Sequence, residues 1–242
     1  MNPFSLEGRT ALVTGANTGI GQAISVSLGK AGAHVICAGR SSCAETVGMI
    51  ESAEELQLDF SDPMAAQGIF DGHDVDILVN NAGIIRRADS VDFSERDWDD
   101  VIGVNLKAVF FTCQSFAKAR LARGATGAIV NIASLLSFQG GIRVPSYTAS
   151  KHGVAGLTKL LANEWAAKGI NVNAIAPGYI ATNNTEALRN DPERNKAILE
   201  RIPAGRWGEA SDIGEAAVFL ASPAAHYIHG AVLNVDGGWL AR

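Results

Sequence analysis

The sequence is poor in cysteine and has no long apolar run. Its three cysteines, at positions 37, 43 and 113, form no Cys-x-x-Cys pair and are odd in number, which argues against a disulfide framework and for a reducing compartment. No segment approaches the ~18 uninterrupted apolar residues of a membrane-spanning helix, and the first residues lack the basic and apolar regions of a secretory signal. These absences predict a soluble, cytoplasmic protein with no membrane partner.

The chain also lacks a dense basic run and a metal-binding pattern. Its 20 Lys and Arg stand against 25 Asp and Glu, a net charge of -5, so nucleic acid is not a predicted partner. His226 and His229 are spaced i, i+3, but no third ligand is evident and no His-Glu-x-x-His pattern occurs, so no metal is predicted. With 47% hydrophobic residues among 242, the chain can form a large core.

Short apolar runs alternate with longer amphipathic ones along the whole chain. This order is typical of parallel sheets built from β-α-β units. A helix is predicted over Gly19 to Ala31, and strands are predicted over 10–14, 34–39, 56–58, 77–80, 128–132, 171–176 and 232–235. The sequence therefore predicts an α/β fold, a single-domain Rossmann-type doubly wound parallel sheet of about seven strands with helices on both faces, spanning residues 1–242.

Two connections depart from this regular alternation. Only about fifteen residues separate Arg40 from the strand near Leu56, close to the ~10–12 that a whole crossover needs, so any helix there must be short. Residues 178–208 contain Pro192 and Pro203 and no strand signal, yet they follow a strand's carboxyl end, where open α/β sheets bind ligands. We expect this segment to be a helical, mobile substrate lid.

A glycine-rich turn, residues 14–21, lies between the first strand and the first helix. Gly15 permits a tight turn, Gly19 lets the backbone approach phosphates, and Gly21 allows the helix to pack on the strand. The helix N-terminus adds free N–H groups and a positive dipole end. Because a strand precedes this turn and a helix follows it, a dinucleotide site is favoured over a purely structural turn.

Ser134, Tyr147 and Lys151 form a pattern suited to alcohol and ketone chemistry. A helix repeats every 3.6 residues, so Tyr147 and Lys151, at i and i+4, lie on one helix face. An unperturbed tyrosine has a pKa of about 10, and we expect the nearby ammonium to lower the pKa of Tyr147 so that it acts as acid or base nearer neutral pH. Ser134, on a separate segment, would hold the substrate oxygen.

The end of the second strand bears on the choice between NAD and NADP. An acidic residue there would accept hydrogen bonds from a ribose 2′-hydroxyl and select NAD, but Gly39 and Arg40 stand in its place. A guanidinium can pair with a 2′-phosphate, which favours NADP. Arg40 could equally stack on adenine or lie in solvent.

Together these features resemble the short-chain dehydrogenase/reductase family. The resemblance rests on the Thr-Gly-x-x-x-Gly-x-Gly turn, the Asn80-Asn81-Ala82-Gly83 stretch, Asn105, Ser134 and Tyr147-x-x-x-Lys151, and it covers almost the whole chain. It implies a catalytic tetrad of Ser134, Tyr147, Lys151 and Asn105, the last holding a proton-relay water; Asn105 could also bond its own backbone at a helix bend. It further implies a cofactor, NAD(P)(H), bound by Gly15, Asn17, Thr18, Gly19, Ile20, Gly21, Arg40, Asp59, Phe60, Asn81, Ala82, Gly83, Tyr147, Lys151, Pro177, Gly178, Ile180 and Thr182.

Stretches 137–151, 175–185 and 202–208 and the C-terminal Val-Asp-Gly-Gly-Trp-Leu-Ala-Arg are similar to a sugar-acid branch of that family. The similarity implies a small-molecule sugar acid as substrate, a place in uronate degradation and a homotetramer. That branch is described as using NAD, whereas Gly39 and Arg40 favour NADP.

The residues near these motifs independently suit an anionic polyol. Arg86 and Arg87 follow the Asn81-Ala82-Gly83 turn, and Arg143 lies four residues before Tyr147, so guanidinium groups can grip a carboxylate. Each arginine is equally well explained as a surface charge or an intersubunit ion pair. The residues predicted to bond hydroxyl groups are Gln139, Asn183 and Asn184.

Two other functions fit the same motifs. A 3-oxoacyl-acyl-carrier-protein reductase would use the same tetrad but would need a basic patch for its carrier and an apolar groove for the acyl chain. A non-catalytic dinucleotide-binding protein would keep the fold without the chemistry. Loss of Ser134, Tyr147 or Lys151 would have indicated the latter, and all of these residues are present.

Overall fold

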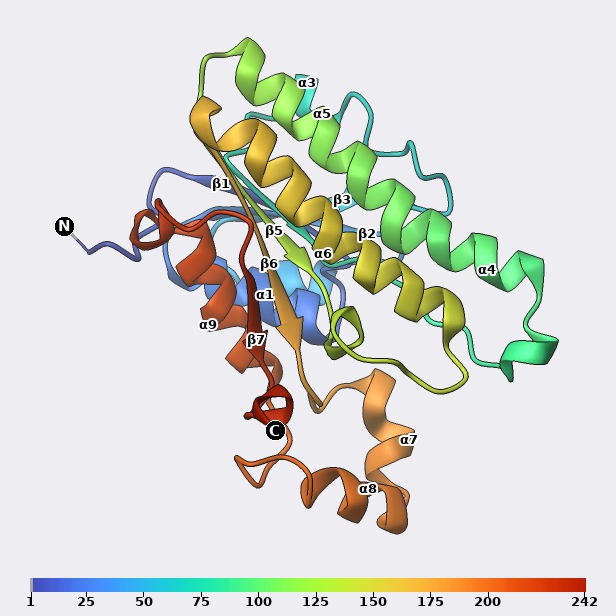
Figure 1. The fold of residues 1–242 in the computed structure, drawn as a ribbon. Coiled ribbons are helices and arrows are strands. Elements are labelled where there is room, and N and C mark those ends of the chain that lie inside the picture. Colours follow the sequence, from blue (N-terminus) through green and yellow to red (C-terminus); the bar gives the residue numbers. More distant parts are fainter. Residues whose placement is uncertain (1) are drawn as a thin grey trace.

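The computed structural model describes residues 2–242, except for the side chain of Asn184, and contains one parallel sheet between two layers of helices (Figure 1). The strand order is β3-β2-β1-β4-β5-β6-β7, and every pairing is parallel. The strands are β1 (Thr10–Thr14), β2 (His34–Gly39), β3 (Ala53–Gln57), β4 (Ile77–Asn80), β5 (Gly127–Ile132), β6 (Ile170–Pro177) and β7 (Val232–Val235). The predicted doubly wound sheet is confirmed.

The strand burial follows from this order. Every residue of the central strands β4 and β5 is buried, as expected for parallel strands covered on both faces. Strand β3 lies at an edge, and its Glu54 and Glu55 are exposed. Its bounds differ from the predicted 56–58 because polar edge residues hide a strand whose backbone pairs with β2.

Helices of two groups cover opposite faces of the sheet (Figure 1). On one face lie α4 (Glu95–Ile102), α5 (Ala108–Ala122) and α6 (Pro145–Trp165), and on the other α1 (Gly19–Lys30) and α9 (Ala210–Ala221). Phe116 of α5 belongs with Ile129 to one hydrophobic cluster, whereas Leu28 of α1 belongs with Val130 to the other. Because Ile129 and Val130 are consecutive in β5, they supply opposite faces of the sheet.

Short helices occupy the remaining connections. The connection after β2 contains only α2 (Ala44–Val47), which confirms the predicted short helix, and the one after β3 contains α3 (Ile69–Gly72). Beyond the carboxyl end of β6, the chain forms a 3₁₀ turn (Asn183–Thr185), α7 (Glu186–Arg189) and α8 (Pro192–Leu199). Figure 1 shows α7 and α8 projecting past this end of the sheet, near the C-terminus.

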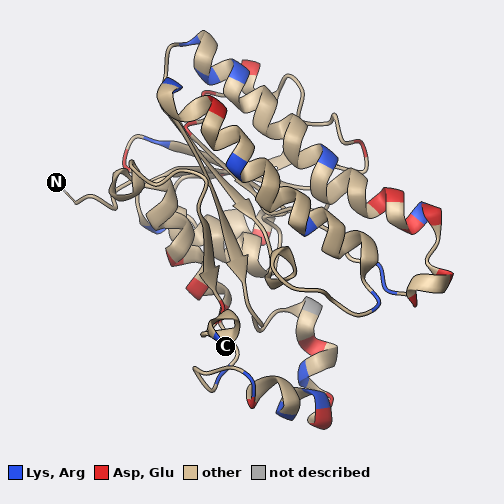
Figure 2. Ribbon diagram, viewed as in Figure 1, with Lys and Arg blue, Asp and Glu red and all other residues tan. Residues whose placement is uncertain are grey.

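The surface carries charges of both signs. Figure 2 shows Lys and Arg interspersed with Asp and Glu along the helices, with no face given over to one sign in this view. Among residues 2–242, every helix is too short or too polar to cross a bilayer.

Candidate active site

The site lies where the chain reverses its direction of winding, between β1 and β4, which are neighbours in the sheet. In open α/β sheets, ligands bind at this switch point, outside the carboxyl ends of the strands. The glycine-rich turn follows β1, and the stretch Asn81 to Gly83 follows β4. The two turns are therefore brought side by side by the topology.

Hydrogen bonds fix these two turns to each other. The Thr14 hydroxyl accepts from the backbone N–H groups of Asn81 and Ala82 at 3.0 Å each, and the Asn81 amide donates to the carbonyls of Thr14 and Gly15. A Cβ on Gly21 would stand 2.1 Å from the Gly15 carbonyl oxygen, so only glycine fits there. The Asn81 side-chain amide thus holds the glycine-rich turn in place, and the remaining backbone of the turn is free to contact a ligand.

The N-terminus of α1 offers a place for an anion. Its first turn carries no acidic side chain, and the N-cap residue Thr18 makes no side-chain capping bond, so backbone N–H groups remain available. The Thr182 methyl carbon lies 3.6 Å from the Cβ position of Gly19, which places the start of the predicted lid across the turn. Gly19 and Thr182, two of the predicted cofactor contacts, therefore lie side by side.

The adenosine end of the site is shaped by Gly39 and the loop after it. A Cβ on Gly39 would lie 2.9 Å from both the Cys43 sulfur and the Ser41 carbonyl oxygen, so no acidic side chain fits at this position. Arg40 is exposed and makes no ion pair with any described side chain.

Glu55 holds that loop in place. Its carboxylate accepts from the Ser42 hydroxyl at 3.1 Å and from the Cys43 backbone N–H at 3.0 Å. Of the two residues predicted to bracket the adenine, Asp59 accepts from the backbone of its own loop, while the Phe60 side chain is buried in the core. Only the backbone of Phe60 is then left to contact a base.

Tyr147 and Lys151 lie on the first two turns of α6, as their spacing predicted. The Lys151 ammonium lies 5.5 Å from the centroid of the Tyr147 ring and donates to the Ile132 carbonyl of β5 at 2.6 Å. Burial lowers the pKa of Lys151 to about 8. This bond uses one of the three donors on an ammonium, so two donors of Lys151 remain.

The expected lowering of the tyrosine pKa by Lys151 is wrong. Burial raises the pKa of Tyr147, and the influences that oppose the rise come from the Ser134 hydroxyl and, more weakly, the Arg87 guanidinium. The physical reason is that burial of the phenol outweighs these opposing influences, and the Lys151 ammonium, which is bonded to the Ile132 carbonyl, is not among them. At neutral pH Tyr147 is therefore a proton donor.

Asn105 lies in a π-helical turn (Gly103–Lys107) that joins α4 to α5, a feature frequent at functional sites. It is fully buried. Its amide donates to the Ile84 carbonyl and its amide oxygen accepts from the Ile84 N–H, each at 2.8 Å. The alternative in which Asn105 bonds its own backbone at the helix bend is wrong, because its side chain holds the loop at Ile84 instead; its part in holding a relay water stays a prediction.

Ser150 was not predicted as a site residue. It is fully buried, donates to the Tyr147 carbonyl at 2.8 Å and accepts from the Asn105 amide at 3.4 Å, so it links two members of the tetrad. A serine inside a helix next to Lys151 is the one signal that could have revealed it, since serine is neutral to unfavourable in helix interiors.

The arginines predicted to bind the substrate are already paired with carboxylates. Arg86 pairs with Asp97 and Asp100 of α4, at 3.3 and 3.5 Å, and Arg143 pairs with Asp89 at 3.0 Å. Arg143 also has a φ of 65°, unlike any other described non-glycine residue.

The amide residues of this set are placed differently. The Gln139 side chain accepts from the Trp239 indole at 3.3 Å, which ties the C-terminal tail to the loop before α6. Asn183 is exposed, and the side chain of Asn184 is outside the described structure. Of the remaining predicted cofactor residues, Pro177 ends β6, and Gly178 and Ile180 follow it. The Gly178 N–H donates to the Val235 carbonyl at 2.9 Å.

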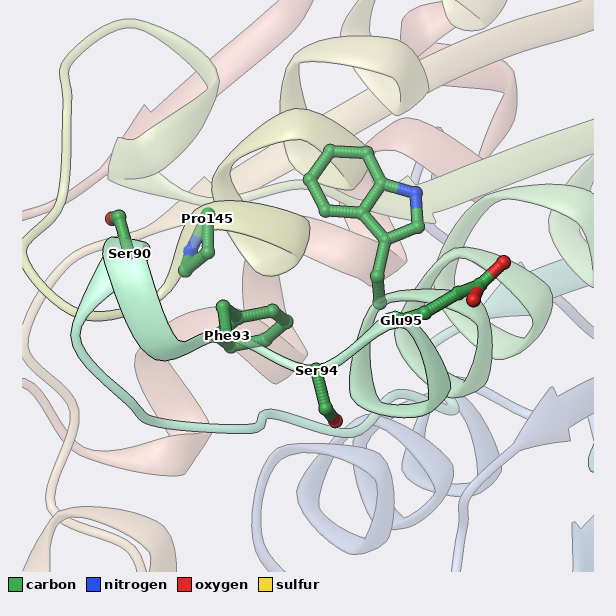
Figure 3. A pocket seen from close by; sticks show the side chains of 6 residues that line it. Ser90, Phe93, Ser94, Glu95 and Pro145 are labelled. Carbon is green, nitrogen blue, oxygen red and sulfur yellow. The ribbon is translucent and has the colours of Figure 1, made fainter.

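A hollow of about 330 Å³ lies beside the site rather than within it. It is lined by Ser90, Phe93, Ser94, Glu95, Trp98 and Pro145. In Figure 3 Phe93 and Pro145 face one another across it. None of the predicted site residues lines this hollow.

Neither metal nor thiol chemistry is indicated by the described residues. Within 2–242, His, Cys, Asp and Glu side chains do not gather in groups of three or more that suit a metal ion. Burial raises the pKa of the Cys37 thiol to about 11 and that of Cys113 to about 12. These thiols stay protonated at neutral pH and are poor nucleophiles.

Comparison with known proteins agrees with this geometry. A family model described as enoyl-(acyl carrier protein) reductase matches residues 15–240. The chain belongs to the short-chain dehydrogenase/reductase family, which confirms the resemblance drawn from its motifs.

Individual relatives within the family share a high sequence identity with this chain. The chain is 56% identical to a 2-dehydro-3-deoxy-D-gluconate 5-dehydrogenase of Bacillus subtilis, over 99% of this chain and 97% of the relative. It is 52% identical to the protein of that name from Dickeya dadantii, over 100% and 99% of the two chains. A crystal structure from Agrobacterium tumefaciens, which carries the provisional name 2-deoxy-D-gluconate 3-dehydrogenase and has NADP bound, is 73% identical, covers 100% of both chains and superposes with a TM-score of 0.99.

Proposed function

We propose that the protein is an NAD(P)-dependent oxidoreductase that interconverts a secondary alcohol and a ketone on a deoxy sugar acid, of the 2-deoxy-D-gluconate or 2-dehydro-3-deoxy-D-gluconate type. The observation that carries the proposal is the convergence of Tyr147, Lys151 and Asn105 next to the loop after β4, which is itself bonded to the glycine-rich turn. The names of its full-length relatives supply the substrate class.

The proposed reaction moves two parts of one C–OH unit, a hydride at the carbon and a proton at the oxygen. A bound nicotinamide accepts or returns the hydride at the carbon, and Tyr147 exchanges the proton at the oxygen. In ketone reduction Tyr147 donates its proton, and the raised pKa of the phenol keeps it in the donor form at neutral pH. The Ser134 hydroxyl donates a hydrogen bond to the substrate oxygen as negative charge develops there.

The other members of the tetrad support this proton transfer. Lys151 donates to the ribose hydroxyls of the nicotinamide half, using the donors that Ile132 leaves free. Asn105 fixes the π-turn whose backbone holds a relay water, and Ser150 connects that turn to Tyr147. Proton exchange with solvent then follows a path of buried polar groups.

NADP is the proposed cofactor in preference to NAD. The absence of room for a carboxylate at Gly39 and the unpaired guanidinium of Arg40 both favour a 2′-phosphate over a 2′-hydroxyl. The relative from A. tumefaciens carries NADP. The remaining cofactor contacts are proposed as the sequence predicted them.

Residues 178–208 are proposed to form the substrate lid of a single catalytic domain. The segment contains α7 and α8, and two contacts hold its carboxyl-terminal end. The Arg206 guanidinium binds the Asp212 carboxylate of α9 at 2.9 and 3.2 Å, and the Trp207 indole donates to Asn195 of α8 at 2.7 Å. Arg86, Gln139, Arg143, Asn183 and Asn184 are proposed to line the cleft below it.

We also propose a cytoplasmic homotetramer. The three cysteines are free and buried, which suits a reducing compartment. Trp98, Leu121 and Leu160 expose 41%, 39% and 47% of their surface on the helix layer of α4, α5 and α6, where subunit contacts would cover them. Light scattering of the purified protein, expected at the mass of four chains, tests the assembly.

Initial-rate assays test the proposed reaction. We expect oxidation of NADPH with 2-dehydro-3-deoxy-D-gluconate, and reduction of NADP with 2-deoxy-D-gluconate, at kcat values within the ordinary range of about 1–10³ s⁻¹. An acetoacetyl thioester serves as the competing substrate. Turnover of the thioester in preference to the sugar acids would instead favour an acyl-carrier-protein reductase.

A further inference from the structure

Ser137 is bonded to two members of the proposed tetrad. It closes a 3₁₀ turn (Leu135–Ser137) whose N-cap residue is Ser134. Its backbone N–H donates to the Ser134 carbonyl at 2.9 Å, and its hydroxyl donates to the Lys151 carbonyl of α6 at 2.7 Å. Ser137 therefore joins the turn that carries one proposed catalytic group to the helix that carries two others.

Neither Ser137 nor Lys151 needs this bond to satisfy its own polar group locally. A carbonyl inside an α-helix already accepts from the N–H four residues further on, and Lys151 lies within α6. A buried serine hydroxyl commonly donates to a carbonyl of its own segment, as Ser222 does to Phe219 at 2.8 Å. Ser137 is buried but reaches a separate element, so its bond fixes the spacing between the turn and α6.

Lys151 holds the backbone on both sides of Ser134. Its ammonium donates to the carbonyl of Ile132, which precedes Ser134, at 2.6 Å. Its own carbonyl accepts from the hydroxyl of Ser137, which follows Ser134, at 2.7 Å. Because both ends of this segment are bonded to one residue of α6, Ser134 is fixed relative to Tyr147, one turn before Lys151 on the same helix.

The neighbouring side chains of the turn have other partners. The Ser134 hydroxyl accepts from the Leu136 N–H at 3.2 Å, within the turn, which leaves its hydrogen for a substrate oxygen. Leu135 belongs to a small hydrophobic cluster with Ile202 and Trp239. The bond from the turn to the backbone of α6 is therefore made by Ser137.

We propose that Ser137 is a positioning residue that holds the Ser134 hydroxyl beside Tyr147 for proton transfer. The proposal rests on the proposed function and adds a residue to its site. Ser137 acts through Ser134 and not on the substrate, because its one hydroxyl hydrogen is already donated to Lys151.

The first test is a double-mutant cycle at Ser134 and Ser137. Single-turnover hydride transfer from bound NADPH to 2-dehydro-3-deoxy-D-gluconate is measured in Ser137→Ala, Ser134→Ala and the double variant. We expect Ser137→Ala to slow this step about 10- to 100-fold in the parent, as a displacement of ~1 Å can do. When Ser134 is already alanine, the further loss should stay below about 3-fold. Equal factors in the two backgrounds, or a parental rate in Ser137→Ala, would overturn the proposal.

The pH profile of Ser137→Ala provides a second readout. The Ser134 hydroxyl opposes the rise in the pKa of Tyr147 that burial causes, so displacing this hydroxyl should raise that pKa further. The charged groups near the phenol, Lys151 and Arg87, are the same in both proteins. Since alcohol oxidation needs the phenolate, its rate should begin to rise at a higher pH than in the parent. An unchanged profile would contradict the assignment.

Ser222→Ala is the matched control. Ser222 is 6% exposed, against 8% for Ser137, and it follows α9 beside the N-terminal segment, where the Ala224 N–H donates to the Pro3 carbonyl. We expect a similar loss in the free energy of unfolding with a parental rate in the folded protein. A rate loss equal to that of Ser137→Ala would overturn the proposal.

Failure of the proposed function gives a different result. A parent enzyme that reduces no deoxy sugar acid would contradict the proposed function itself. The cycle at Ser134 and Ser137, measured on any ketone that the parent does reduce, would still decide the role of Ser137.

Discussion

Asn105 and Ile84 exchange two hydrogen bonds of 2.8 Å, so that one buried amide satisfies both backbone groups of a residue in the loop after β4. This pair connects the π-turn between α4 and α5 to the loop that carries Arg86 and Arg87. The catalytic helix is joined to the same point through Ser150. The loop that borders the substrate and the proton path therefore depend on one side chain.

Replacing Asn105 by alanine should affect stability and catalysis together. Both polar groups of Ile84 lose their partner in a buried place, which costs about 1–3 kcal/mol for each group left unsatisfied. We expect a lower free energy of unfolding in urea and a lower kcat.

Asn173 offers a control for that variant. It is equally buried and makes a similar pair of bonds, accepting from the Ala231 N–H at 3.0 Å and donating to the Ile228 carbonyl at 2.7 Å. Asn173→Ala should lose similar stability while its folded fraction keeps the parent kcat. Equal kcat values in the two variants would show that Asn105 has only a structural role.

The affinity for the cofactor should depend on pH through Lys151. Burial lowers the pKa of this ammonium from 10.5 to about 8, so it is charged below that pH and loses its proton above it. Because ribose hydroxyls and phosphates favour the charged donor, binding is strongest below pH 8 and weakens as pH rises through it. Fluorescence titration of NADPH from pH 6 to 10 measures this, and Lys151→Met should abolish the dependence. A flat profile in the parent enzyme would refute the assignment.

Arg40→Ala should change the choice of cofactor. Loss of the guanidinium removes a charge-assisted pair with the 2′-phosphate, worth about 1.5–3 kcal/mol, so KM for NADPH should rise by about one to two orders of magnitude. KM for NADH, which has no such phosphate, should stay nearly the same. Initial rates measured with NADPH and with NADH test this prediction. A parallel rise in the two KM values would contradict the proposed role of Arg40.

Most of the fold follows from patterns that are local in the sequence. The central strands are continuous apolar runs, and the glycine-rich turn is bounded by a strand and a helix. Strand β3 is harder to place because its exposed Glu54, Glu55 and Gln57 resemble a polar loop until the pairing with β2 is known. Its stability comes from a neighbour distant in the sequence.

The residues of the site could be predicted from the sequence, but their pKa values and ion pairs could not. The spacing of Tyr147 and Lys151 gives their common helix face, yet it cannot show that the ammonium bonds the Ile132 carbonyl of strand β5 or that burial raises the pKa of the phenol. Nor can it show which arginine stays unpaired, because the carboxylates of Asp97 and Asp100 reach Arg86 only after α4 has docked. These properties depend on tertiary contacts.

The account as a whole depends on proton transfer by the Tyr147 hydroxyl. Tyr147→Phe removes that oxygen while keeping the ring that packs on Lys151. We predict a fall in kcat of about 10²–10⁴-fold, the usual contribution of general acid–base catalysis, with the Kd for NADPH within a few-fold of the parent value. The decisive measurement is single-turnover reduction of 2-dehydro-3-deoxy-D-gluconate by bound NADPH in the Tyr147→Phe protein. Near-parental hydride transfer in this variant would contradict the account.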